Sequence, residues 1–247
     1  MALQSIKDKT ALVTGASRGI GKAIALALAA EGVNLALTAR SAGALTATVD
    51  ECRRRGHDNI RVEPFAADFL DPAAPGRLME AAAARFGKID FLINNAGCAD
   101  NVTFEETTME QWERFMSVNA RAPFFLCQAA LQFLRKSDAP VIINVSSVVG
   151  RQGYPNQAAY GASKHALLGF TKAMAREVQK DGIRVYALSP GATATDLIRS
   201  MRPDLDSSVL IAPEELAEIA VFLLKFRGNA MVDEINVRRD AGTPWAG

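Results

Sequence analysis

Three side chains near the middle of the sequence could together polarise a carbonyl group and move a proton. Ser147 comes shortly after the apolar run 141–143, which is short and β-branched and therefore predicts a buried strand. Tyr160 and Lys164 stand one turn apart in a helical pattern, so they lie on one face of that helix. A hydroxyl at a strand end, a phenol and an ammonium group can converge on one substrate oxygen.

The pairing of Tyr160 with Lys164 favours acid–base chemistry. A free tyrosine has a pKa of about 10, which is high for proton transfer near neutrality. An ammonium group about 5 Å from the phenolate would lower that pKa by about two units at an effective dielectric near 20. A tyrosine and a lysine at this spacing are usually a packed ring and a solvated charge. Ser147, which could donate a hydrogen bond to the carbonyl oxygen, and a glycine-rich turn near the N-terminus favour catalysis instead.

That glycine turn follows a short apolar strand predicted at 10–14. Gly15, Gly19 and Gly21 open a helical pattern that stops at Gly32. Their spacing differs from the common G-x-G-x-x-G, and glycines in such a turn are often only steric. However, backbone amides and a helix N-terminus at this place can approach a pyrophosphate. The position after the first strand therefore predicts nucleotide binding.

Arg40 indicates which nicotinamide cofactor is bound. It closes the second predicted strand, 33–39, where an acid would accept a hydrogen bond from the free 2′-hydroxyl of NADH. An arginine pairs instead with the 2′-phosphate of NADPH, and no acid stands beside Arg40. Ser17 and Arg18 could add further contacts. The sequence favours NADP(H), and an ordinary solvated charge at a helix start is the alternative.

Strand-like and helix-like segments alternate along the whole chain. Ser41 could cap a helix that ends near Gly56, and Thr108 with Gln111 resembles a capping box. Pro123 should bend or interrupt the helix that follows Thr108. Further strands are predicted at 60–65, 89–93, 183–188 and 231–237, and helices at 71–86, 108–136, 156–180 and from Pro213 onward. This alternation predicts an α/β Rossmann fold, a doubly wound parallel sheet of about seven strands with helices on both faces, as one domain over 1–247.

Composition indicates which partners and which location in the cell to expect. The chain has 247 residues, 49% hydrophobic and 22% charged, with a net charge of +1, so neither nucleic acid nor a membrane is an expected partner. The three cysteines have no metal or redox spacing, and neither His57 nor His165 is given a role. The N-terminus lacks the apolar segment of a signal peptide, and no apolar run could span a membrane. We expect a cytoplasmic protein without a metal.

The motifs together resemble the short-chain dehydrogenase/reductase family along essentially the whole chain. Thr14 with the three glycines resembles its cofactor turn, 94–97 its N-N-A-G signature, and Tyr160-x-x-x-Lys164 its catalytic pair. The resemblance implies a catalytic tetrad of Asn119, Ser147, Tyr160 and Lys164. The NADP(H)-binding residues that it implies are Gly15, Ser17, Arg18, Gly19, Ile20, Gly21, Arg40, Asp68, Asn95, Ala96, Gly97, Tyr160, Lys164, Pro190, Gly191, Thr193 and Thr195.

The same resemblance assigns individual roles. Lys164 would also bind the ribose hydroxyls, and Asn119 would hold a water that links Lys164 to solvent. Asp68 would meet the adenine ring. The segment 190–195 would hold the nicotinamide carboxamide.

Within the family, the segments 147–150 and 160–178 resemble the 3-oxoacyl-carrier-protein reductases. This implies NADPH-dependent reduction of a 3-oxoacyl thioester, as in fatty acid biosynthesis, with an acidic carrier protein received on Arg135, Lys136 and Arg176. The loop at about 196–212 would be a lid over an integral substrate pocket. Its apolar residues suit an acyl chain, and they are Leu197, Ile198, Met201 and Leu210.

Two alternatives stay open. One is a dehydrogenase of another secondary alcohol, such as a sugar, a steroid or a small diketone; the other is a non-catalytic regulator that binds the cofactor. The C-terminal segment departs from the family's V-D-G-G pattern, because Val237 is followed by Arg238, Arg239 and Asp240. The family implies a homotetramer assembled through the helices at 108–136 and 156–180.

Overall fold

The computed structural model describes residues 3–56 and 60–243, and its centre is one seven-stranded sheet. The order of the strands is β3-β2-β1-β4-β5-β6-β7, and every neighbouring pair is parallel. The strands are β1 Thr10–Thr14, β2 Asn34–Ala39, β3 Val62–Ala66, β4 Phe91–Asn94, β5 Val141–Val145, β6 Arg184–Pro190 and β7 Glu234–Val237. The predicted doubly wound parallel fold is confirmed.

Burial explains why the central strands are mostly apolar. Every residue of β1, β4 and β5 is buried, because helices cover both faces of the sheet. The edge strands β3 and β7 are partly exposed.

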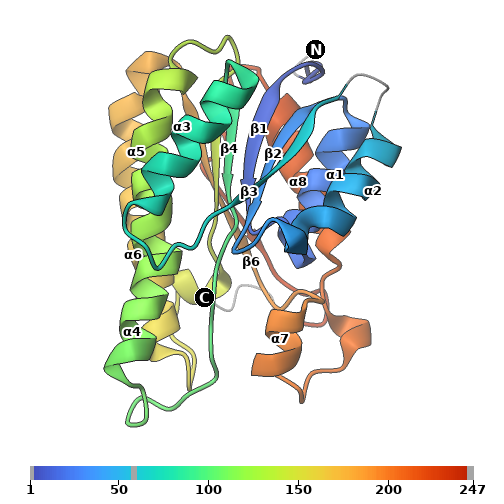
Figure 1. The fold of residues 1–247 in the computed structure, drawn as a ribbon. Coiled ribbons are helices and arrows are strands. Elements are labelled where there is room, and N and C mark those ends of the chain that lie inside the picture. The colour runs from blue at the N-terminus through green and yellow to red at the C-terminus, as the bar shows by residue number, and fades with distance from the viewer. Residues whose placement is uncertain (1–2, 57–59, 244–247) are drawn as a thin grey trace.

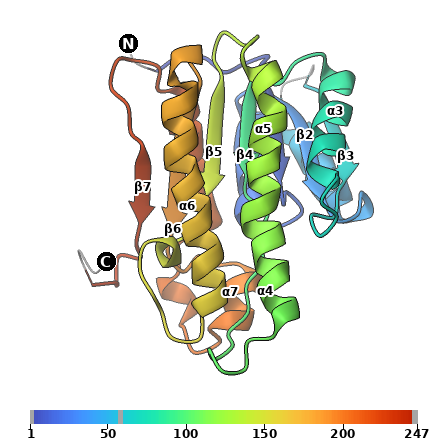
Figure 2. The same ribbon diagram turned by 90° about the vertical axis from the view of Figure 1, so that its left-hand side faces the viewer.

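Two helical layers enclose the sheet (Figures 1 and 2). On one face lie α1 Gly19–Ala30, α2 Thr46–Arg55 and α8 Pro213–Lys225, with α1 packed against both of the others. On the other face lie α3 Ala74–Phe86, α5 Ala122–Leu134 and α6 Ala158–Val178. Each face has its own cluster of buried apolar side chains, so the sheet separates two cores.

The helical stretch after Thr108 begins and is interrupted as predicted. Thr108 Oγ1 accepts from the N–H of Gln111, and the side chain of Gln111 accepts from the N–H of Thr108, which is the capping box. The first helix is α4, Met109–Met116. A π-helical turn at Ser117–Arg121 then separates it from α5, in which Pro123 lies in the first turn. A proline is tolerated there because first-turn N–H groups have no partner within the helix.

Several element boundaries differ from the prediction. Ser41 does not cap α2, because a 3₁₀ turn at Gly43–Leu45 precedes that helix and Ser41 lies too far from its first turn. Strand β6 continues to Pro190, two residues beyond the predicted end. The predicted lid contains a short helix, α7 Asp196–Met201, and a 3₁₀ turn at Ser207–Val209. His57 lies outside the described residues. Among those described, no helix is long and apolar enough to cross a membrane.

The strand order reverses between β1 and β4, and ligands of such sheets bind at the strand carboxyl ends near that reversal. In Figure 1, α7 lies beyond this end of the sheet. Further short turns near the strand ends are the 3₁₀ segments Val148–Gly150 after β5 and Gln179–Asp181 before β6.

Candidate functional site

A cavity of about 1430 Å³ lies at the carboxyl ends of the strands. Pockets for a single small molecule usually measure about 300–1,000 Å³, so this one has room for a dinucleotide and a second ligand. Most residues that the sequence singles out line it. They are Gly15, Ser17, Arg18, Gly19, Ile20, Arg40, Asp68, Asn95, Ala96, Gly97, Ser147, Tyr160, Lys164, Pro190, Gly191, Thr193 and Thr195. Gly21 and Asn119 lie behind the lining.

The glycine turn packs so closely against the segment after β4 that side chains larger than glycine would not fit. Gly15 has φ of +66°, and a Cβ placed on it would lie 2.9 Å from Cα of Ala96. A Cβ on Gly21 would lie 2.3 Å from Nδ2 of Asn95, so Gly21 supports the turn from behind. A Cβ on Gly19 would lie 2.9 Å from Cγ2 of Thr195, the residue that caps α7.

Asn95 and Thr14 fasten this turn to the neighbouring strand β4. Thr14 Oγ1 accepts from the backbone N–H groups of Asn95 and Ala96, each at 2.9 Å. Asn95 Nδ2 donates to the carbonyl of Thr14 at 2.9 Å and to that of Gly15 at 3.2 Å. The N-N-A-G segment is therefore a clamp on the glycine turn as well as part of the cavity wall.

The end of the cavity near β2 and β3 suits a phosphorylated nucleotide. Arg40 is exposed at the end of β2, and its guanidinium has no ion-pair partner within 3–56 and 60–243. Arg18 in the glycine turn pairs only loosely with Asp196, at 3.4 Å. Asp68, after β3, accepts a hydrogen bond from the N–H of Leu70. These residues fit a dinucleotide that carries an extra phosphate near Arg40.

Ser147 and Lys164 come to the same place from different elements. Ser147 begins the 3₁₀ turn after β5, and its Oγ accepts from the N–H of Val149 at 3.3 Å. Lys164 is buried on α6, and its Nζ donates to the carbonyl of Val145, the last residue of β5, at 3.0 Å. The same Nζ lies 6.0 Å from the centre of the Tyr160 ring. Strand β5 thus sets the position of both groups.

The pKa values of Tyr160 and Lys164 differ from the expectation that Lys164 would make the phenol more acidic. Burial raises the pKa of Tyr160 to about 12, although the hydrogen bond with Ser147 opposes that rise. Burial also lowers the pKa of Lys164 to about 8. Because both groups are enclosed by protein, desolvation outweighs the attraction that was predicted to make the phenol acidic. In the protein alone, Lys164 does not lower the pKa of Tyr160.

Asn119 is held in the π-helical turn by three hydrogen bonds. Its Nδ2 donates to the carbonyl of Cys98 at 2.8 Å and to Oγ of Ser163 at 3.0 Å, and its Oδ1 accepts from the N–H of Cys98 at 2.9 Å. A Cβ on Gly97 would lie 3.3 Å from Asn119 Oδ1 and 3.7 Å from Lys164 Nζ. The side-chain amide therefore joins the loop after β4 to α6.

A buried polar chain behind the site was not predicted. Asn94 Nδ2 donates to Oδ1 of Asn144, and Asn144 Nδ2 donates to Oγ1 of Thr171, each at 2.8 Å. These bonds tie β4 to β5 and β5 to α6, the helix that carries Tyr160. The signal in the sequence was an asparagine at the end of a fully apolar strand.

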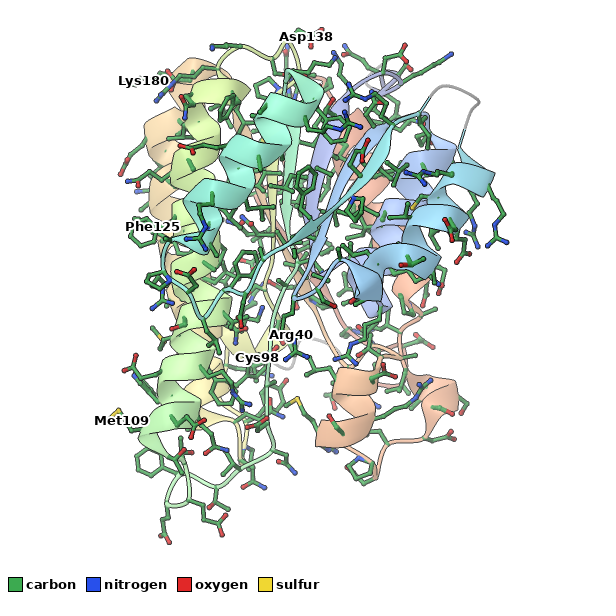
Figure 3. All side chains as sticks on the ribbon, viewed as in Figure 1. Arg40, Cys98, Met109, Phe125, Asp138 and Lys180 are labelled. Atoms are coloured by element: carbon green, nitrogen blue, oxygen red, sulfur yellow. The ribbon has the colours of Figure 1, made fainter. Side chains whose placement is uncertain are left out.

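The basic residues assigned to a carrier protein lie far from this cavity. Figure 3 shows Arg40 and Cys98 at one end of the sheet and Asp138 and Lys180 at the other. Arg135 and Lys136 follow the end of α5, near Asp138, and Arg135 pairs with Asp181 at 2.8 Å. Arg176 is in the last turn of α6, about 24 Å along the helix from Tyr160. The structure does not bring these three residues to the site.

The sheet order, the glycine turn at its switch point and the buried Ser147, Tyr160 and Lys164 define a dinucleotide-binding oxidoreductase fold and site. The model of the family described as short chain dehydrogenase matches residues 9–206. The chain therefore belongs to the short-chain dehydrogenase family, and the predicted family is confirmed.

Individual relatives cover most of the chain. It is 41% identical over 196 residues to short-chain dehydrogenase/reductase FrzI of Cladobotryum sp, covering 78% of this chain and 74% of that protein. It is 36% identical over 227 residues to a 3-oxoacyl-[acyl-carrier-protein] reductase of Synechocystis sp., covering 90% and 91%.

Solved structures agree with the fold over nearly the whole chain. An alcohol dehydrogenase of Thermococcus sibiricus complexed with 5-hydroxy-NADP has a TM-score of 0.87 at 28% identity, covering 96% of this chain and 99% of that one. A metagenomic short-chain oxidoreductase in complex with NADP has a TM-score of 0.82 at 30% identity, covering 96% and 99%.

Proposed function

We propose that this protein uses NADPH to reduce a ketone to a secondary alcohol. The observation that carries the proposal is that Ser147, Tyr160 and Lys164 border the same cavity as the glycine turn and Arg40. The two similar structures with NADP-type ligands support the choice of cofactor. We further propose that the whole chain acts as one domain with the substrate pocket built into it.

The bound nicotinamide would supply the hydride. Ser147 donates a hydrogen bond to the carbonyl oxygen, which stabilises the negative charge that develops there. Tyr160, whose pKa is about 12, is protonated throughout the neutral range and gives its proton to that oxygen. Lys164, whose pKa is about 8, can return a proton to Tyr160, and Asn119 holds the loop and helix between which Lys164 lies.

The substrate we propose is a 3-oxoacyl thioester. The relative from Synechocystis, which is 36% identical and named for that substrate class, supports this proposal. Leu197, Ile198 and Met201 of the lid border the cavity and provide apolar surface for an acyl chain. If a carrier protein docks on Arg135, Lys136 and Arg176, the group that links it to the acyl chain must be long enough to reach the cavity. An Arg176→Glu variant that reduced carrier-bound and CoA-bound substrates equally well would exclude docking at this place.

A second candidate is oxidation or reduction of another secondary alcohol or ketone. The likeness to an alcohol dehydrogenase over 96% of this chain favours it. A panel of thioesters, diketones, sugars and steroids distinguishes the two, because a thioester reductase should prefer acetoacetyl-CoA by more than tenfold in kcat/KM.

The test of the reaction is NADPH oxidation with acetoacetyl-CoA by the wild-type protein and by Tyr160→Phe. Loss of the proton donor should lower kcat by about 10²–10⁴-fold, the usual contribution of general acid catalysis. NADPH binding, followed by its fluorescence, should stay within about twofold because the phenyl ring keeps its place. A Tyr160→Phe variant with full turnover would show that this phenol is not the acid.

The test of the cofactor is Arg40→Asp. The variant should raise the KM for NADPH by tenfold or more and change the KM for NADH far less, because only NADPH has the phosphate that the arginine would bind. Arg77→Gln is a matched control, since Arg77 is an exposed arginine on α3 outside the cavity lining. Equal changes for both cofactors would show that Arg40 does not contact the 2′-phosphate.

A further inference from the structure

Arginines gather at the end of the cavity opposite Arg40. Arg151 follows the 3₁₀ turn after β5, and Arg238 and Arg239 follow β7; all three line the cavity. We call these three residues the arginine corner. A Cβ on Gly191 would lie 3.7 Å from Cα of Arg238 and 3.8 Å from the backbone nitrogen of Arg239. The corner therefore adjoins the Pro190–Gly191 segment, on the substrate side of the proposed site.

The three guanidinium groups have different partners. Arg238 donates to the carbonyls of Arg239, Asp240 and Gly242 at 2.9, 2.9 and 3.1 Å, so it shapes the turn after β7. Arg151 lies 3.5 Å from Glu234, a carboxylate that also accepts from Ser189. The half-buried Arg239 has no side-chain hydrogen bond or ion pair within 3–56 and 60–243.

The acids of the cavity wall are engaged elsewhere. Asp100 pairs with Arg114, and Asp196 lies near Arg18 and Arg199. Asp68 accepts from a backbone N–H at the far end, after β3. None of these three carboxylates pairs with the arginine corner, and the one ion pair of the corner within residues 3–56 and 60–243 joins Arg151 to Glu234.

The phosphates of the cofactor do not account for this charge. Arg40 and Arg18, which fit them, lie at the ends of β2 and β1. In the sheet, β2 and β6 are separated by β1, β4 and β5, so their ends are about 19 Å apart at the usual strand spacing. This end of the cavity is therefore left for a second ligand, the substrate.

We propose that Arg239, assisted by Arg151, binds an oxyanion on the substrate, a carboxylate or a phosphate carried by the ketone. A guanidinium group offers two parallel N–H donors that match such an oxyanion. Arg238 is a positioning residue, because its bonds to the following carbonyls hold the turn that presents Arg239. This inference rests on the proposed ketone reduction and specifies its substrate class.

The experiment compares charged and neutral substrates in the wild-type protein and in Arg239→Gln. One pair is a set of oxo acids, namely acetoacetate, levulinate and 5-oxohexanoate, against their methyl esters. The other pair is acetoacetyl-CoA against acetoacetyl-N-acetylcysteamine, which has the thioester but no phosphate. In Arg239→Gln, kcat/KM for the charged member should fall tenfold or more, mainly through KM, and that for its neutral partner should change less than twofold.

Two further variants separate binding from structure. Arg239→Lys should recover part of the preference for the charged substrate, because lysine keeps the positive charge but lacks the two parallel N–H donors of the guanidinium. Arg77→Gln, outside the cavity, should leave the ratio of charged to neutral substrate unchanged. If Arg239→Gln loses the preference for the oxo acids over their methyl esters, the oxyanion that Arg239 binds is a carboxylate. If it loses the preference for acetoacetyl-CoA over acetoacetyl-N-acetylcysteamine, that oxyanion is a phosphate.

The outcomes for the two proposals differ. If the wild-type protein reduces ketones but neither pair loses its charge preference in Arg239→Gln, the oxyanion site is wrong and the ketone reductase stands. If no ketone of either pair is reduced with NADPH, the proposed function itself fails.

Discussion

At the scale of single residues, Lys164 is the group whose environment is most unusual. Its ammonium is buried with one backbone carbonyl as its hydrogen-bond partner among the described residues, and its pKa falls from 10.5 to about 8. A buried cation without a counter-charge costs folding free energy, so the protein keeps it at the expense of stability. That cost is understandable if the amine must lose and regain a proton near neutral pH.

The pH dependence of stability tests this description of Lys164. Between about pH 8 and 10.5 the unfolded chain holds the lysine proton and the folded chain does not, so the contribution of Lys164 to stability should rise with pH. That contribution should rise by up to about 1.4 kcal/mol per pH unit in this window, while the three cysteines, whose pKa values burial raises from 9.0, act in the opposite direction. Lys164→Met keeps the cysteines, so the difference in unfolding free energy between the two proteins, measured by urea unfolding at pH 7.5 and 10, isolates the lysine. A difference between them that does not change with pH would mean that Lys164 titrates normally.

Sequence patterns predicted those parts of the site whose geometry depends only on the spacing of residues along one element. Tyr160 and Lys164 share a helix face because they are four apart, and this needs no tertiary information. Asn119 could be located but its bonds could not, because the π-helical turn changes which way the side chain faces. In the sequence, Arg239 stands out only as a departure from the family's C-terminal pattern. Its proximity to Arg151 depends on β7 pairing with β6, which no local pattern describes.

At the scale of elements, the position of α6 decides whether the site is intact. The helix is attached to β5 by Asn144, which donates to Thr171 in its middle, and by Lys164, which donates to Val145 near its start. Both bonds are buried. Strand β5 and α6 therefore form one unit that holds Ser147, Tyr160 and Lys164 together.

Removing the hydroxyl of Thr171 should loosen this unit. In Thr171→Val the shape of the side chain is kept, but Nδ2 of Asn144 loses its buried acceptor, which costs about 1–3 kcal/mol of unfolding free energy. Chemical denaturation measures the loss. Thr171→Ser keeps the hydroxyl and should lose less. A Thr171→Val protein as stable as the wild type would show that this hydrogen bond does not hold the unit together.

Element boundaries were predicted well where the signal lies within one turn of the chain. Thr108 and Gln111 mark the start of α4 because each caps the other's backbone N–H. Ser41 is of a residue type that favours an N-cap, but it does not mark the start of α2 because a 3₁₀ turn intervenes. The end of β6 was placed too early, because Ser189 and Pro190 suggest a loop while pairing with β7 keeps them extended.

At the scale of the whole molecule, α4 and α5 expose apolar side chains on the helical face that also carries α6. Phe124 and Phe125 of α5 are 44% and 42% exposed, and Phe124 makes an edge contact with Phe170 of α6 at 5.3 Å. Large apolar groups on a surface mark association sites. We propose that this face is an interface of a homotetramer.

Sedimentation should therefore show a tetramer of the 26.5 kDa chain, and Phe125→Glu should shift it to smaller species, because a charge would be buried at the interface. Phe104→Glu changes an exposed phenylalanine on the loop before α4 and should leave the assembly intact. A wild-type protein that sediments as a monomer, or a tetramer unaffected by Phe125→Glu, would place the interface elsewhere.

The close approach of Gly19 and Thr195 joins the glycine turn to the start of α7. Because Cγ2 of Thr195 occupies the space beside Gly19, the residue that caps α7 rests on the turn that we expect to receive the nucleotide. Even one methyl group at Gly19, where φ is +55°, would strain the turn and press on Thr195. We therefore expect Gly19→Ala to raise the KM of the nucleotide and, by displacing α7, that of the ketone as well. A glycine of the proposed nucleotide site would then also determine where the segment that borders the substrate lies.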